Sequence, residues 1–229
     1  MSFLIGYTSL LLTLQVLEKL GRTKSRGSAK TPSSSRPLFL SPPFVNASLV
    51  KGSFKTIVVL PKYVDEDEWL AVNVFEFFNY LNLFYGSVTD FCTTSSCPSM
   101  SAGPGVEFYW IDHTRKSAKL SAPTYIDYVM TWIQNLLNDE ATFPTKAGRE
   151  FPSDFKQTIK QIFKQSFRVF AHIYHNHYDK ILHLREEGHF NSLFAHFISF
   201  AKEFNLLDKK ELGPLEELIE VMEANGHFS

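Results

Sequence analysis

The sequence predicts a mainly α-helical protein, and two observations support this fold class. Apolar residues recur at helical spacing in several long stretches that begin near residues 66, 123, 154, 189 and 208. Only one short region, residues 106–120, has the alternation and turn residues of a β-hairpin. Long amphipathic helices with one small hairpin are typical of a helical bundle.

The first helix is predicted to begin at Glu66. Asp65 is a candidate N-cap, and Glu68 stands three residues after Asp65, which is the spacing of a capping box. Gly86 follows the last apolar residue of this pattern and is the predicted stop. The next segment, residues 87–105, is predicted to be an irregular loop that holds both cysteines of the chain.

The hairpin and the later helices follow in order. Strands at 106–111 and 117–120 are expected to flank a turn at Asp112–Lys116. Four helices are predicted after it. The first spans 123–138, with Pro123 in its first turn, and the second is a long helix that starts after Ser153 and runs to Glu187, where Gly188 stops it. The last two span 189–204 and 208–224, the latter capped by Asp208 and ended by Gly226.

The composition limits the class of protein. With 229 residues, 44% hydrophobic and 21% charged, the chain can build a large core, and its 22 Phe residues bury much apolar area. A formal net charge of −1 argues against nucleic acid as a partner. Two cysteines do not make a disulfide framework, so a reducing compartment, the cytoplasm, is expected.

Residues 1–37 are interpreted as a divergent tail that precedes the folded domain at 38–229. The apolar stretch 3–17 is shorter than the ~20 residues that a membrane span requires, and no Lys or Arg precedes it. A short helix or loose tail is favoured there, with a gene-model artefact and a targeting segment as alternatives. Residues 21–37 are rich in Gly, Ser, Pro and Lys/Arg, which predicts a disordered basic linker. Residues 38–63 are predicted to be an extended arm.

Two groups of potential metal ligands lie far apart in the sequence. Cys92 and Cys97 are the only cysteines, and His172, His175 and His177 fall within six residues. Two thiolates and two imidazoles complete a tetrahedral Zn²⁺ shell, which leaves no position for water or substrate. This favours a structural zinc in a binding protein.

Spacing alone does not choose the two histidines. On a helix His172 and His175 share a face, whereas His172 and His177 are ~140° apart and could converge from neighbouring turns. The alternative to a metal site is a free cysteine pair with solvated histidines.

A zinc hydrolase is the weakest functional alternative. His175, His177 and Asp179 begin like an H-x-H-x-D metallo-hydrolase signature, but the next residue is Lys180 where that signature has His. The signature also belongs to a strand-to-loop junction, whereas this run lies in a helical pattern. The sequence contains no P-loop, Rossmann glycine pattern or G-x-S-x-G elbow.

An acidic cluster marks the start of the first helix. Asp65, Glu66, Asp67 and Glu68 are consecutive, and Glu76 lies two turns further on. Carboxylates at a helix N-terminus are stabilised by the helix dipole. Four in a row exceed what capping requires, so the cluster also indicates a negative surface for Lys and Arg of a partner.

A basic repeat marks the long helix. Lys156, Lys160, Lys164 and Arg168 recur every four residues. Like charges at this spacing repel by a few tenths of a kcal/mol per pair. The repeat therefore has two interpretations: a site for an anion or phosphopeptide, or a solvated face neutralised by Asp and Glu from elsewhere.

From about residue 38 to 225, the chain resembles the Mob (Mps-one-binder) kinase-activator family. The matching motifs are EWLAVNVFEFFNYLNLFYG, FC-x4-CP-x-MSAGP, SAPTYIDYVMTWIQ, FRVFAHIYHNHYD and HFISFAKEFNLLDKKELGPLEELIE. The arm from residue 38 is similar to the fungal branch that partners NDR-type kinases. The resemblance implies a non-catalytic helical bundle whose structural zinc is held by Cys92, Cys97, His172 and His177, which leaves His175 as a non-ligand.

The resemblance also implies a partner, the basic N-terminal regulatory segment of an NDR/LATS-type AGC kinase. The matching acidic residues are Asp65, Glu68 and Glu76, which flank Trp69. Roles in polarised growth and morphogenesis are implied, in the cytoplasm, at the cell cortex or at sites of polarised growth, with the nucleus as a further location.

A second partner is implied by related members, in which a basic pocket binds phosphothreonine peptides from upstream Hippo-type kinases. Lys164 and Arg168 match that pocket, but the intervening arginine is Gln165 here. A phosphopeptide-binding adaptor is therefore the alternative function.

Overall fold

The computed structural model describes residues 36–111, 114–146 and 148–228. The predictions for the apolar stretch 3–17 and for all but the last two residues of the basic linker 21–37 lie outside these residues.

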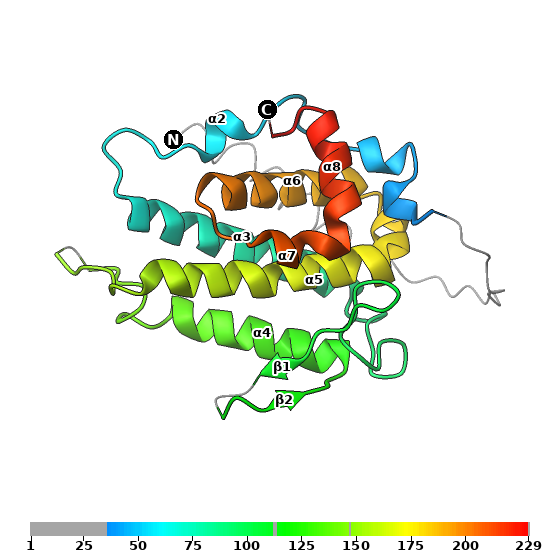
Figure 1. Cartoon of the computed structure of the whole chain (residues 1–229), viewed down its shortest axis with the longest axis horizontal. Helices are drawn as coiled ribbons and strands as arrows, with labels where there is room; N and C mark the ends of the chain where they lie inside the picture. The colour runs from blue at the N-terminus through cyan, green and yellow to red at the C-terminus, as the bar shows by residue number, and fades with distance from the viewer. Residues whose placement is uncertain (1–35, 112–113, 147, 229) are drawn as a thin grey trace. The chain divides into compact units, whose positions relative to one another are not determined.

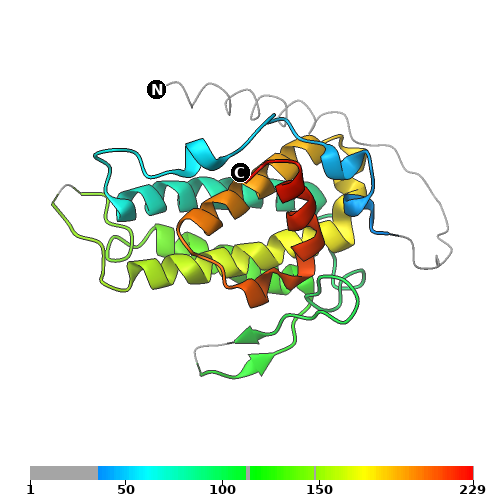
Figure 2. The ribbon, with the colours of Figure 1, turned by 45° about the horizontal axis from the view of Figure 1, so that its top comes forward.

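The architecture is a helical bundle with one small antiparallel hairpin, which confirms the predicted fold class (Figure 1). The elements are η1 (Leu38–Leu40), η2 (Phe44–Asn46), α2 (Lys55–Val58), α3 (Glu66–Val88), β1 (Trp110–Ile111), β2 (Ser117–Ala118), α4 (Ala122–Leu137), α5 (Phe155–His183), α6 (Glu187–Glu203), α7 (Lys209–Leu212), η3 (Gly213–Leu215) and α8 (Glu216–Ala224). Helix α5 is central and packs against α3, α4 and α6, as both ribbon views show (Figures 1 and 2).

Helix α3 begins where the sequence predicts and ends later. The Asp65 carboxylate accepts hydrogen bonds from the backbone N–H of Asp67 (2.9 Å) and of Glu68 (3.3 Å), which confirms Asp65 as the N-cap. The predicted stop at Gly86 is wrong by two residues, because the helix continues to Val88. Glycine weakens a helix by only about 1 kcal/mol, and the burial of Val88 can offset this cost.

The end of α5 was predicted at Glu187, which is wrong by four residues. Arg185 adopts a left-handed conformation (φ 60°), and the N–H of Glu186 reaches back to the carbonyl of Ile181 (3.1 Å). This is the bonding pattern of a Schellman C-cap, in which Arg185 takes the position that glycine usually fills. Gly188 lies inside α6 instead.

The predicted helix 208–224 is divided at Pro214. Proline has no N–H to donate and its ring crowds the preceding turn, so α7, η3 and α8 replace one helix. Asp208 occupies the N-cap position of α7, but its side chain makes no capping hydrogen bond. Gly226, with φ 81°, follows α8 as predicted, and the N–H of His227 bonds the carbonyl of Met222.

The arm at 38–63 packs along the domain as predicted, but the prediction that it is extended is wrong in part. It contains the short helical turns η1, η2 and α2. In a helical turn, side chains three or four residues apart point to the same side, whereas successive side chains of an extended segment alternate between two sides. The turns therefore direct more of the arm's apolar residues toward the domain. The buried residues of the arm are Phe39, Leu40, Val45, Phe54 and Val58.

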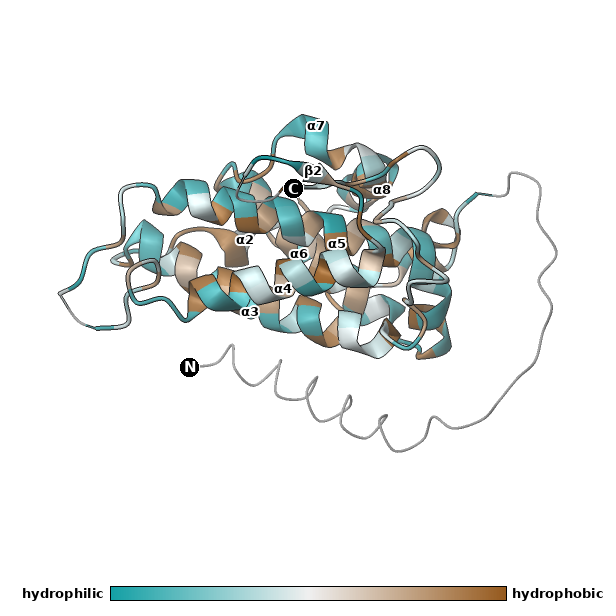
Figure 3. Cartoon of the chain, turned by 90° about the horizontal axis from the view of Figure 1, so that it is seen from below, coloured by the Kyte–Doolittle hydropathy of each residue, from teal (hydrophilic) through white to brown (hydrophobic). Residues whose placement is uncertain are grey.

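Aromatic rings form the centre of the core. Phe163 of α5 stacks on Phe197 of α6 (centroids 4.6 Å apart) and meets Phe77 of α3 edge to face (5.8 Å). The helices carry hydrophobic and hydrophilic residues side by side, as amphipathic helices do (Figure 3). No helix within the described ranges is long and apolar enough to cross a bilayer.

We expect Phe163→Ala to lower the free energy of unfolding by about 3–5 kcal/mol, because it removes a ring that is 1% exposed and leaves a cavity among three helices. Phe75→Ala is the matched control: its ring is 53% exposed, and the expected change is within about 0.5 kcal/mol. Chemical denaturation measures both. Equal losses for the two variants would contradict the packing described here.

Candidate functional site

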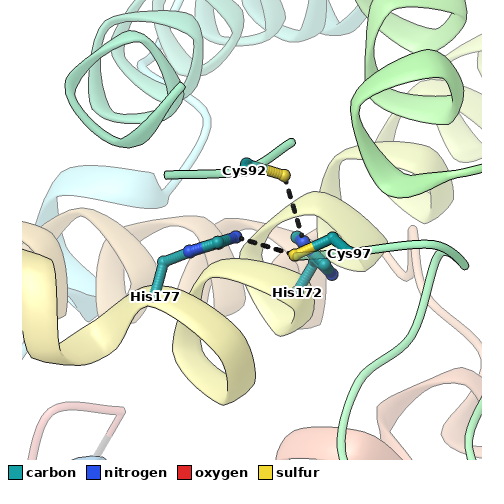
Figure 4. A group of neighbouring side chains, drawn as sticks. All are labelled: Cys92, Cys97, His172 and His177. Atoms are coloured by element: carbon teal, nitrogen blue, oxygen red, sulfur yellow. Dashed lines mark hydrogen bonds between the residues drawn. The ribbon is translucent and has the colours of Figure 1, made fainter. Parts of the chain in front are cut away.

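Four predicted metal ligands come together in the structure. Cys92 and Cys97, from the loop after α3, face His172 and His177 of α5, all four are buried, and their ligand atoms lie within 4.8 Å of one another (Figure 4). The Sγ atom of Cys92 is 3.4 Å from Nε2 of His172, and that of Cys97 is 3.4 Å from Nε2 of His177. A tetrahedral ion with bonds of about 2.0–2.3 Å has edges of roughly 3.3–3.8 Å, so this cluster can hold a metal ion.

The local fold of the cysteine loop turns both sulfurs toward α5. The N–H of Cys92 bonds the carbonyl of Val88 and so extends the last turn of α3, while the N–H of Cys97 bonds the carbonyl of Thr93 (2.8 Å). The Ser96 hydroxyl closes the loop by donating to the carbonyl of Phe91 (2.6 Å). The five-residue cysteine spacing therefore forms one compact turn.

A backbone carbonyl orients the ring of His172. Nδ1 of His172 lies 2.8 Å from the carbonyl oxygen of Ser101, which fixes the proton on Nδ1 and leaves the Nε2 lone pair directed at the sulfurs. The side-chain amide of Asn176 donates to the same carbonyl (3.1 Å). This arrangement presents a neutral imidazole in the form that a metal ligand requires.

Burial shifts the titration of the cluster in two directions. It lowers the pKa of His172 to about 4 and also lowers that of His177, so both rings are neutral near pH 7. Burial and the neighbouring Cys97 raise the pKa of Cys92 to about 12, while a hydrogen bond from Tyr85 opposes this shift. A bound cation would deprotonate such thiols, which is the ordinary state of metal-ligating cysteine.

His175 is turned away from the cluster. Its Nε2 bonds the carbonyl of Pro214 (2.7 Å), and its ring lies edge-on to Phe39. Gly103, at φ +86°, makes room for the ring, since a Cβ there would come within 2.8 Å of Nδ1. The histidines that converge are therefore His172 and His177, the wider pair that spacing alone could not select.

The H-x-H-x-D residues do not gather around one point. Asp179 is exposed and pairs with Lys180 (2.7 Å), and His175 faces Pro214. In the described part of the chain, the group of side chains placed to hold a metal contains neither residue.

The predicted kinase-binding residues lie at the N-terminal half of α3. Asp65, Glu68 and Glu76 are exposed, and Trp69 is half-buried with its indole N–H donating to the carbonyl of Val58 (3.2 Å). Asp65 also has the structural role of capping the helix. This hydrogen bond links α3 to the arm next to the acidic residues.

Two apolar residues of the same surface were missed by the sequence reasoning. Val72 is 57% exposed and Phe75 is 53% exposed, although both belong to the apolar residues that recur at helical spacing after residue 66, a pattern that predicts burial. Val72 lies four residues from both Glu68 and Glu76, hence on their side of the helix, and this spacing was the available signal. We call Glu68, Val72, Phe75 and Glu76 the α3 stripe.

Carboxylates from other helices meet the basic repeat of α5. Lys156 pairs with Glu66 of α3 (2.5 Å), and Lys164 pairs with Glu211 of α7 (2.8 Å). Arg168 lies 3.6 Å from the same Glu211 carboxylate. At these positions the structure has the neutralising acids that the second interpretation of the repeat requires.

Comparison with known proteins identifies the family, since the Mob1/phocein family model matches residues 46–215. The chain belongs to the Mob1/phocein family. It is 55% identical over 199 residues to the CBK1 kinase activator protein MOB2 of Candida albicans, covering 87% of this chain and 64% of the relative. It is 54% identical over 193 residues to the protein of the same name in Saccharomyces cerevisiae, covering 84% and 67%.

A third Mob relative is the maintenance of ploidy protein mob2 of Schizosaccharomyces pombe, 55% identical over 191 residues, covering 83% of this chain and 78% of the relative. The chain thus spans about two thirds of the length of the two CBK1 activators and more of the third relative.

The ligand set leads to a direct prediction. We expect His177→Ala to abolish stoichiometric metal binding and to lower the free energy of unfolding by several kcal/mol, on the order of 3–5. The four ligands converge only in the folded protein, so the free energy of metal binding adds to the free energy of unfolding. His175→Ala should keep the metal, although it loses a hydrogen bond to Pro214.

Elemental analysis of the purified proteins gives the stoichiometry, and denaturation with and without a strong chelator gives the stability. Loss of metal from the His175→Ala protein with retention in the His177→Ala protein would reverse the assignment.

Proposed function

We propose that this Mob protein is a non-catalytic activator and scaffold for an NDR/LATS-type AGC serine/threonine kinase, and that it binds the basic N-terminal regulatory segment of that kinase. The carrying observation is the α3 stripe, in which exposed apolar and acidic side chains alternate on one helix face. The relatives named CBK1 kinase activators support the class of partner.

The apolar residues of the stripe would supply affinity. Val72 and Phe75 are both more than half exposed. Full burial of such side chains is worth about 1.5–3 kcal/mol each, and aromatic anchors at the centre of an interface often carry much of its binding energy. A partner helix with one apolar face fits this pair.

The acidic residues would supply orientation. Glu68 and Glu76 are exposed and, within the described chain, have no ion-pair partner. Opposite charges across an interface accelerate association and set the register of a docked helix. They therefore favour a partner rich in Lys and Arg.

Activation requires no chemistry from the Mob protein. A basic kinase segment with too little core to order itself can fold on this surface, where apolar burial offsets its ordering entropy. The ordered segment then stabilises one arrangement of the kinase over another. Mob binding acts through this difference in affinity between the two arrangements.

We further propose that the metal is Zn²⁺ and that it is structural. Two thiolates and two imidazoles are a usual zinc set, and four protein ligands leave no position for a reactive water. The ion would fasten the loop that follows α3 to α5, and so hold one end of the helix that carries the stripe. A zinc hydrolase has no comparable support, because His175 and Asp179 point elsewhere.

The charge component is tested by the double reversal Glu68→Lys and Glu76→Lys, with Asp65 left intact because it caps α3. We expect the affinity for a recombinant N-terminal segment of an NDR-type kinase such as CBK1 to fall at least tenfold, roughly 1.4 kcal/mol, in a calorimetric titration. The loss should diminish at high salt.

The matched control is Glu216→Lys with Glu220→Lys, which makes the same charge change on exposed residues of α8. Unchanged affinity in the stripe variant, or an equal loss in the control, would reject this surface.

The apolar component is tested by Phe75→Ala. We expect the affinity for the same segment to fall by at least about tenfold with little change in thermal stability, because the ring is exposed in the free protein. Unlike the charge reversal, this loss should persist at high salt. Phe91→Ala, which removes a ring of similar exposure (47%) from the cysteine loop, should leave binding unchanged. Wild-type affinity for Phe75→Ala would count against an apolar anchor.

A further inference from the structure

Helix α4 has an outward face with almost no charge. Among its 16 residues Asp127 is the one that is charged, and the other exposed residues of the helix are Tyr128, Thr131, Gln134 and Asn135. Helix α8, by contrast, has nine residues and exposes four glutamates. A surface that is depleted of charge and carries tyrosine is typical of the core of a protein–protein interface.

The β-hairpin stands beside this face and leaves apolar side chains uncovered. Trp110 of β1 is half-buried and meets Tyr125 and Tyr128 of α4 edge to face, with ring centroids 5.5 Å apart in both pairs. Figure 1 shows the hairpin next to α4 at the edge of the bundle. Successive side chains of a strand point to opposite sides, so Ile111 points away from α4 and is 65% exposed, and Tyr109 is 47% exposed. Exposed apolar side chains grouped in this way mark interaction sites.

Two charges of opposite sign accompany these residues. Asp127 on α4 and Arg115, in the loop between β1 and β2, are exposed, and neither has an ion-pair partner in the part of the chain that the structure describes. The hairpin's other charge pair, Glu107 and Lys119, is satisfied within the hairpin (2.8 Å). One available anion on the helix and one available cation on the hairpin make this surface complementary to itself. We call Tyr109, Ile111, Arg115, Asp127 and Tyr128 the α4–hairpin patch.

This self-complementarity favours a second copy of the chain over a different partner. In a dimer with twofold symmetry the same patch serves both subunits, so that each contact between two different residues occurs twice. If the hairpin of each copy lies over α4 of the other, Arg115 meets Asp127 and Ile111 meets Tyr128 in both directions. A strongly basic or acidic partner has no such complement on a face with one charge of each sign. The α3 stripe cannot pair with itself, because its carboxylates repel one another.

We propose that the α4–hairpin patch is a self-association surface, through which two copies of this chain form a symmetric dimer. Apolar contact of Ile111 with Tyr128 holds the two copies together, and the two Arg115–Asp127 pairs set their register. A 16-residue helix is about 24 Å long, so the contact area lies at the small end of specific interfaces and the dimer is weak and reversible. The dimer uses none of the residues of the α3 stripe.

The apolar contact is tested by sedimentation-velocity ultracentrifugation of the full chain over a series of concentrations. We expect the average mass of the wild type to rise with concentration toward that of a dimer. Ile111→Glu should raise the dissociation constant of the dimer at least about tenfold, because it places a carboxylate in an apolar contact twice. Leu49→Glu is the matched control: it makes a similar change at a residue of the arm that is 56% exposed, and it should associate as the wild type does.

The ion pairs are tested by a charge exchange between copies. Asp127→Arg and Arg115→Asp should each weaken the dimer at least about tenfold, because each variant alone places like charges opposite one another twice. Arg115 has φ 60°, a conformation that aspartate tolerates, so the fold should persist. An equimolar mixture of the two variants should recover wild-type association, since the introduced arginine then meets the introduced aspartate. Damage to the fold of either variant would not be repaired by mixing.

A chain that remains monomeric at its highest soluble concentration overturns the proposal and leaves the patch to a different partner. A dimer that Ile111→Glu does not weaken, or that Leu49→Glu weakens equally, overturns it as well. So does a mixture of the two charge variants that stays as monomeric as each variant alone. None of these outcomes bears on the kinase-segment titration, which depends on residues of α3.

Discussion

The contact between the cysteine loop and α5 is the constraint on which the rest of the arrangement depends. Nδ1 of His172 donates a hydrogen bond to the carbonyl of Ser101 (2.8 Å). The carbonyl of Cys97 accepts a hydrogen bond from the N–H of Ala122 (3.0 Å), the first residue of α4. The end of α3, the start of α4 and the C-terminal half of α5 therefore meet at one cluster. A metal with four protein ligands would turn these separate contacts into one cooperative unit, because losing any ligand releases the others.

The same contacts fix the position of the helix that carries the proposed docking surface. The α3 stripe stands on a helix whose far end leads directly into Cys92 and whose near end is tied to the arm through the hydrogen bond from Trp69 to Val58. Neither end of α3 is free to move alone. A preformed helix face lowers the entropic cost of binding, so in the proposed complex the cluster and the arm would contribute to recognition without touching the partner.

The sequence predicted the features that depend on local chemistry. The helices, the Asp65 cap and the convergence of the two cysteines with histidines of α5 all follow from residue type and spacing. The choice between His175 and His177 did not, because it depends on which side of α5 receives the cysteine loop and which receives Pro214. The end of α5 was missed for a related reason: Arg185 adopts a left-handed conformation that is usual for glycine, and only the surrounding packing can impose it.

Exposure was the property that the sequence could not provide. Apolar residues at helical spacing mark the core face, yet Val72 and Phe75 continue the same pattern onto the solvent side of α3. Only the positions of the neighbouring helices show which part of a broad apolar face is covered. Residues left uncovered in this way are those that can serve an interface.

Charge shows the same dependence on three-dimensional context. The acidic run at 65–68 and Glu76 look equivalent in the sequence, but Asp65 caps a helix and Glu66 pairs with Lys156, while Glu68 and Glu76 have no ion-pair partner in the described chain. On the basic side, Lys164 already has the Glu211 carboxylate as its partner. A charge that is neutralised within the chain must first be released before it can bind another molecule, whereas an unpaired one is available at once. Glu68 and Glu76 are therefore available to a basic partner in the free protein, whereas Lys164 is already neutralised by Glu211 of α7.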